Sequence, residues 1–150
     1  MKGLLALAGV VGALCVPIAA QAATSVQQVP FDADVGLCTS GDIVALSGTL
    51  LITSTTTATP SGGLVVATHF QPQGVSGVDT VTGTMYRATG LTRDLVVSSP
   101  AGGFTETFVN RFHIQATTGA ESFVVNEVVH VTIGADGSVR TEFDKFSSTC

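Results

Sequence analysis

The alternation of apolar and polar residues between positions 104 and 133 is the feature that most constrains the fold of this chain. Apolar side chains fall on even positions in 104–114 and on odd positions in 123–133. A period of two residues is typical of strands that bury one face. The segment therefore predicts two antiparallel strands joined by a tight turn on Thr118 and Gly119.

The change of parity restricts the register of this hairpin, and the turn on Thr118 and Gly119 then selects it. Residues on even positions of one strand face residues on odd positions of the other only when the paired numbers have an odd sum. The turn predicts these pairs: Phe112 with Val125, Phe108 with Val129, and Asn110 with Glu127. Glu106 and Glu127 then interrupt an otherwise apolar face.

The first 22 residues have the pattern of a secretory signal peptide. Lys2 precedes an apolar run, and Ala20-Gln21-Ala22 forms a small-x-small cleavage sequence. The run is too short for a membrane span, and no later stretch is apolar enough to be one. We expect a signal peptide at 1–22, an N-terminal arm at 23–37 and a single domain at 38–150. This organisation predicts a secreted or periplasmic protein.

Two cysteines, Cys38 and Cys150, remain after the signal segment. An even pair in an oxidising compartment predicts a disulfide. A metal or redox pair needs a CxxC-type spacing, which is absent.

Composition favours strands and disfavours anionic partners. The chain has no Trp, one Tyr and many Thr, Val and Gly, a composition that favours strands over helices. It also has 11 acidic residues. The basic residues beyond the signal segment are Arg87, Arg93, Arg111, Arg140 and Lys145. The negative balance argues against nucleic acid and anionic membrane as partners.

Units of a strand followed by a turn recur from residue 42 to residue 146. Strands are expected at 42–53, 64–71, 84–89, 91–98, 104–115, 123–133 and 138–146, with a turn-rich connection or a bent strand at 75–82. Short connections predict an all-β antiparallel up-and-down meander. A Cys38–Cys150 bond would bring the first and last strands together, which favours a closed β-barrel, with a β-sandwich as the alternative.

The segment Asn126-Glu127-Val128-Val129-His130 resembles a degraded zinc motif, but we reject a metal site there. The motif H-E-x-x-H requires a helix that places both histidines on one face, whereas this segment is predicted to be a strand. Ligand spacing is also absent among His69, His113 and His130. No metal and no cofactor is expected.

The two glutamates of the hairpin are candidates for an acid and base pair. The predicted register separates Glu106 from Glu127 by about 13 Å at 3.3 Å per residue, which exceeds the roughly 5–9.5 Å of glycosidase pairs. One expectation is that each glutamate lies at a barrel mouth or completes a polar layer of the interior. The other is that Glu127 and Asn110 form the polar floor of a ligand cavity. His69 is the best placed of the three histidines for such a site. No G-x-S-x-G elbow occurs, so no catalytic residue is assigned.

Several short segments resemble a family of small exported bacterial proteins of unknown function. They are Cys38-x-x-Gly41-Asp42-Ile43-Val44-Ala45-Leu46-Ser47-Gly48, His69-Phe70-x-x-Gln73-Gly74-Val75-x-Gly77, Asn126-Glu127-x-x-His130-Val131-Thr132-Ile133-x-Ala135-x-Gly137, and the ending from Phe146 to Cys150. The resemblance implies that both cysteines and His69 belong to the family pattern. Family members often have His where this chain has Asn126, which weakens a metal site further.

Three functions are compatible with the sequence. The favoured one is an exported domain that binds a small apolar molecule or a partner, with Glu127, Asn110, Glu106 and His69 as candidate ligand-binding residues. The second is a small barrel enzyme of the cyclase or isomerase kind that uses Glu127 for proton transfer. The third is a structural envelope or surface protein, which an exposed apolar patch or an unpaired edge strand would favour.

Overall fold

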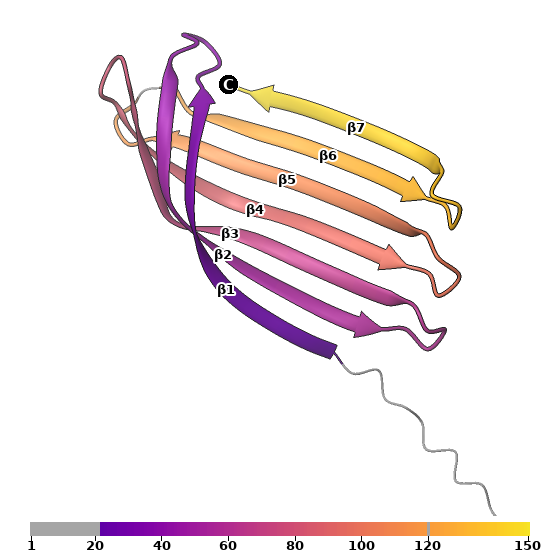
Figure 1. The fold of residues 1–150 in the computed structure, drawn as a ribbon. Coiled ribbons are helices and arrows are strands. Elements are labelled where there is room, and N and C mark those ends of the chain that lie inside the picture. The colour runs from indigo at the N-terminus through magenta and orange to yellow at the C-terminus, as the bar shows by residue number, and fades with distance from the viewer. Residues whose placement is uncertain (1–21, 120) are drawn as a thin grey trace, which may run out of the picture.

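The computed structural model of the protein describes residues 22–119 and 121–150, which form one antiparallel sheet and no helix (Figure 1). The strands follow chain order from one edge to the other: β1 (Ala22–Gly36), β2 (Ile43–Ala58), β3 (Leu64–Asp79), β4 (Met85–Ser98), β5 (Phe104–Ala116), β6 (Phe123–Ile133) and β7 (Val139–Thr149). The predicted all-β meander is confirmed. Within this part of the chain, no helix has the length and apolarity needed to cross a membrane. The predicted signal segment lies outside the described residues, apart from Ala22.

The β5–β6 hairpin has the predicted register. Asn110 lies opposite Glu127, Phe112 opposite Val125, and Phe108 opposite Val129. The prediction succeeded because a one-residue slip would turn the apolar face of one strand outward, and the position of the turn selects among the remaining registers.

The segment expected as an N-terminal arm is a complete edge strand. β1 pairs with β2 from Ala22–Thr57 to Gly36–Ile43. Only the second half of β1, from Val29 to Val35, carries alternating apolar residues. The first half is held by backbone pairing with β2, which the side-chain pattern does not reveal.

β3 and β4 are continuous at positions where the sequence suggested that a strand ends. The glycine-punctuated segment 75–82 is mainly the end of β3, after a register irregularity between Phe70 and Ser76. β4 continues through Gly90 as one strand, where two hinged strands were expected.

The sheet has two edges among the described residues, because β1 and β7 do not pair with each other. The predicted closed barrel is therefore not confirmed, and an open, curled sheet is observed. With seven strands, β1 and β7 run in the same direction, toward the end of the sheet where Cys38 and Cys150 lie (Figure 1). Direct closure would require a parallel pair in an otherwise antiparallel meander.

Curling of the sheet brings distant strands together across its inner face. The ring centres of Phe31 on β1 and Phe112 on β5 are 6.2 Å apart. The buried core gathers at the disulfide end of the sheet and consists of Leu37, Val44, Leu46, Val75, Tyr86, Ala88, Ile114 and Phe123. At the opposite end the strands fan out as a single layer (Figure 1).

Candidate functional site

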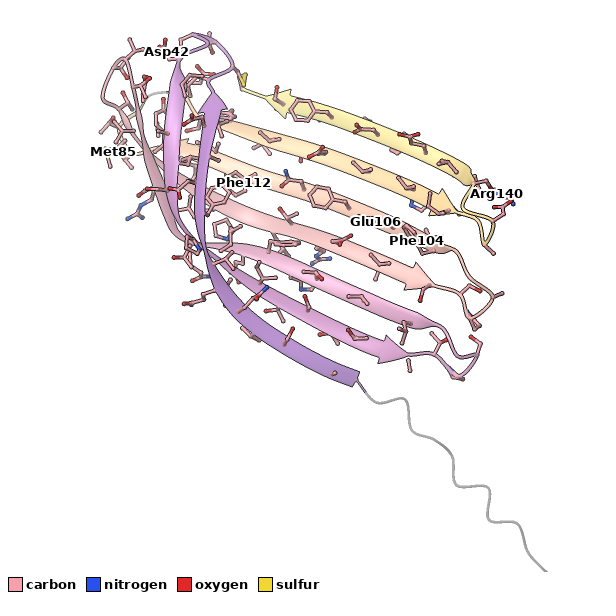
Figure 2. The ribbon with its side chains drawn as sticks, in the orientation of Figure 1. Asp42, Met85, Phe104, Glu106, Phe112 and Arg140 are labelled. Carbon is pink, nitrogen blue, oxygen red and sulfur yellow. A yellow bond between two sulfur atoms is a disulfide. The ribbon has the colours of Figure 1, made fainter. Side chains whose placement is uncertain are left out.

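Cross-strand pairs define the side chains that share the inner face of the sheet, because directly paired residues point to the same side. Figure 2 labels Phe104, Glu106 and Phe112, three members of this face along β5. One row of pairs crosses all seven strands and consists of Gln27, Ile52, Phe70, Thr92, Asn110, Glu127 and Phe146.

A hollow of about 550 Å³ lies on this inner face. Its lining is mainly apolar and includes Phe31, Leu50, Phe70, Phe108, Phe112 and Phe146 from five strands. The volume is within the range of about 300–1,000 Å³ that is typical of small-molecule sites. The curl of the sheet creates the hollow, since β1 and β7 contribute to its lining from opposite edges.

Three polar side chains stand together on one side of the hollow. Thr92, Asn110 and Glu127 are neighbours in the same row on β4, β5 and β6. The Thr92 hydroxyl donates a hydrogen bond of 2.8 Å to Oδ1 of Asn110. This bond orients the Asn110 amide and leaves its nitrogen as the donor available to a bound molecule. The arrangement combines a large apolar surface with a donor and a carboxylate.

Two of the four residues predicted for the ligand site line the hollow, and two do not. Asn110 and Glu127 lie in its wall. Glu106 shares the inner face but pairs with Val131, four residues along β6 from Glu127, and lies outside the hollow. This spacing also matches the predicted separation of the two glutamates.

His69 lies on the opposite, outer face of the sheet. It is exposed and pairs with Arg93, while its neighbour Phe70 lines the hollow. Adjacent residues of a strand point to opposite faces, so His69 cannot join Glu127 in one site. The sequence left this open because it did not fix which face of residues 64–71 turns inward.

The rejected zinc motif is indeed on a strand. Glu127 faces inward from β6, whereas His130 faces outward, where its Nδ1 lies 2.8 Å from the Thr107 hydroxyl. The two side chains therefore do not converge on a metal ion.

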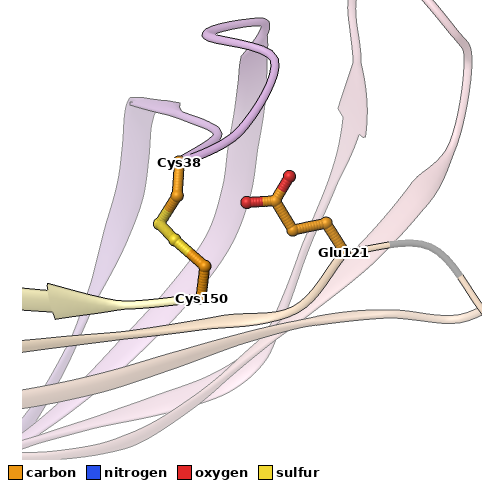
Figure 3. Close-up of side chains that lie close together, drawn as sticks. All are labelled: Cys38, Glu121 and Cys150. Atoms are coloured by element: carbon orange, nitrogen blue, oxygen red, sulfur yellow. A yellow bond between two sulfur atoms is a disulfide. The ribbon is translucent and has the colours of Figure 1, made fainter.

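The predicted disulfide is present between Cys38 and Cys150, with their Cα atoms 6.2 Å apart (Figure 3). Glu121 lies close to both sulfur atoms and accepts a hydrogen bond of 3.0 Å from the Thr39 amide. The sulfurs are bonded to each other, so this cluster does not offer two thiolates to a metal ion. The bond is compatible with an oxidising, extracellular compartment.

Sequence reasoning missed Asp94 and the whole contribution of β1. Asp94 lies on the inner face of β4, between Thr68 of β3 and Phe108 of β5. Its Oδ1 atom is buried without a hydrogen-bond partner. The parity of Thr92 and Val96 was the available signal for Asp94, and the alternation from Val29 to Val35 was the signal for β1.

The fold and the hollow together define a class of protein: a small all-β domain whose curled antiparallel sheet offers an apolar, carboxylate-bearing concave surface. Comparison with known proteins gave no match to a family model, a curated protein or a solved structure. The resemblance to small exported proteins therefore stays a prediction.

Proposed function

We propose that the protein is an exported binding domain that holds a small apolar molecule in the hollow on its inner face. The observation that carries the proposal is the hollow of about 550 Å³ lined by six side chains of Phe and Leu. Apolar surface of this extent gains free energy when a ligand displaces water from it. Asn110 and Glu127 would orient the polar end of the ligand.

The proposal is tested with diphenylhexatriene, a neutral apolar dye that fluoresces when it leaves water. We expect the purified mature chain to bind this dye. Phe146→Ala should weaken binding roughly fivefold, which corresponds to about 1 kcal/mol of lost contact. Phe146 is 64% exposed, so its truncation spares the core.

A matched control lies on the same strand. Phe143 is 49% exposed and pairs with His130 on the outer face. Phe143→Ala should leave the dye affinity unchanged. Equal losses in the two variants, or no binding by the original chain, would overturn the proposal.

Proton transfer is a second candidate function, favoured by the position of Glu127 and Asn110 in one hollow. An enzyme of the cyclase or isomerase kind would use Glu127 as its acid or base and Asn110 as a donor to the substrate. Glu127→Gln removes the group that would transfer the proton. If the protein catalyses such a reaction and this variant keeps the activity, the mechanism is excluded.

A structural role is a third candidate, favoured by the unpaired edges of β1 and β7 among the described residues. Edge strands offer backbone groups to another chain. Sedimentation of the mature chain over a wide concentration range tests this role, and a monomer throughout would contradict self-assembly through these edges.

A further inference from the structure

Apart from Arg140, which has no paired position at the start of β7, the charged side chains of β3 to β7 are sorted by face. The row next to that of Glu127 contains Asp94 and Asp144, and the following row contains Glu106 and Glu142. All five carboxylates therefore point to the inner face. No basic residue occurs in these three rows of paired positions.

Basic side chains occupy the outer face instead. His69, Arg93 and Lys145 fall in one outer row, and Arg111 falls in the next. The single ion pair among the described residues joins Arg140 to Asp136 at the β6–β7 turn. The inner carboxylates thus have no cationic partner within this part of the chain.

The inner carboxylates are also close to one another. Asp94 and Glu106 are diagonal neighbours on adjacent strands, and so are Glu127 and Asp144. Diagonal positions are roughly 7–8 Å apart. Like charges at this spacing repel each other, and burial of the unpartnered Asp94 Oδ1 adds the cost of lost hydration. A cation beside Glu127 and Asp144 would relieve the repulsion between these two carboxylates.

We infer that the ligand of the inner face is a cationic amphiphile, an amine or quaternary ammonium with an apolar body. This inference rests on the proposed function and specifies its ligand. The apolar body would lie against Phe31 and Phe112 in the hollow, and the cationic group beside Glu127 and Asp144. The ring of Phe146, which pairs with Glu127, adds a surface that attracts cations.

Three dyes with one fluorophore test the inference on the mature, disulfide-bonded chain: neutral diphenylhexatriene, its trimethylammonium derivative and its propionate derivative. We expect the cationic dye to bind about tenfold more tightly than the neutral dye, and the anionic dye to bind more weakly than both. The preference for the cationic dye should shrink as salt is raised, because salt screens exposed charges.

Charge-removing variants locate the preference. Glu127→Gln should lower the affinity for the cationic dye about threefold to tenfold. The affinity for the neutral dye should change much less, because Gln keeps the size of the side chain and removes only its charge. Asp34→Asn is the matched control, since Asp34 is exposed and pairs with Ala45 on the outer face. It removes one negative charge from the whole protein and should leave both affinities unchanged.

The outcomes separate the inference from the function on which it rests. Equal binding of the three dyes, or equal effects of Glu127→Gln and Asp34→Asn, would overturn the cationic ligand and leave the apolar site intact. Absence of binding by all three would overturn both. If Glu127→Gln fails to fold, the salt dependence of the original chain still decides, and a preference that does not change with salt would overturn the inference.

Discussion

The Asp79 side chain holds the β3–β4 turn. It is 2% exposed. One carboxylate oxygen accepts hydrogen bonds from the amides of Val81 and Thr82, and the other accepts one from the Thr82 hydroxyl. The Thr82 hydroxyl and the Val81 amide hold the pKa of Asp79 below its ordinary value, against the opposing effect of burial.

Acid should weaken the fold through Asp79. The pKa of Asp79 is lower in the folded state than in the unfolded state. Between these two pKa values the unfolded chain therefore binds more protons than the folded chain. The resulting stability is present above the ordinary carboxyl pKa of about 4 and is lost as the pH falls through the lower folded pKa. We expect Asp79→Asn to lower the midpoint of thermal unfolding at pH 7.

The difference in unfolding free energy between the original chain and Asp79→Asn should shrink below about pH 4. Thermal unfolding followed by circular dichroism over pH 2–7 measures it. Asp32→Asn, on the exposed face of β1, is the control and should show a much smaller difference. A constant difference across this range would contradict the role of the Asp79 carboxylate.

Among the strands, β2 shows how a glycine permits the sheet to curl. Gly48 has φ of +157° and lies at the register shift between Ser47 and Thr49. A Cβ atom at this position would approach Cα of Val75 to 2.7 Å. The close approach of β2 and β3 at this bend therefore requires glycine.

Gly48→Ala should destabilise the protein by about 1–3 kcal/mol, because the new Cβ meets backbone and cannot be accommodated by a side-chain rotation. Gly36→Ala is the matched control. Gly36 ends the edge strand β1, and an added Cβ there has nothing within 4 Å. Urea unfolding of both variants measures the effect, and equal stabilities would show that the bend tolerates a side chain.

At the scale of the whole molecule, the disulfide substitutes for strand pairing between the two edges. β1 and β7 run in the same direction and do not pair among the described residues, but Cys38 follows β1 and Cys150 follows β7. The bond therefore ties both edges together at the end of the sheet that holds the core. Phe31 on β1 and Phe146 on β7 line the same hollow, so we expect its shape to depend on this bond.

Replacing both cysteines, Cys38→Ser with Cys150→Ser, should cost up to about 5 kcal/mol, because the bond closes a long loop in the unfolded chain. The two residues are 112 positions apart. The variant should also bind diphenylhexatriene less tightly. Reducing agent should reproduce both effects in the original chain and have no effect on the variant. Unchanged dye binding after reduction would show that the hollow does not need the tie.

The sequence by itself determined the all-β antiparallel class, the β5–β6 register and the disulfide. One alternating apolar face together with the position of the turn sets a hairpin register, and two cysteines beyond the predicted signal segment leave one pairing. It also indicated Asn110 and Glu127 as neighbours on the buried side, which the structure confirms. These features depend on residues close in sequence or on a single pair of thiols.

Only the tertiary structure decided the number of strands, the openness of the sheet and the membership of the site. The polar half of β1 became a strand through backbone pairing, and this strand made the total odd and the two edges parallel. In β3 the even-numbered side chains of residues 64–70 face inward. Phe70 therefore lines the hollow, and His69 lies on the opposite face from Glu127. These features depend on how the whole sheet curls. The alternation of side chains within one strand does not predict that curvature.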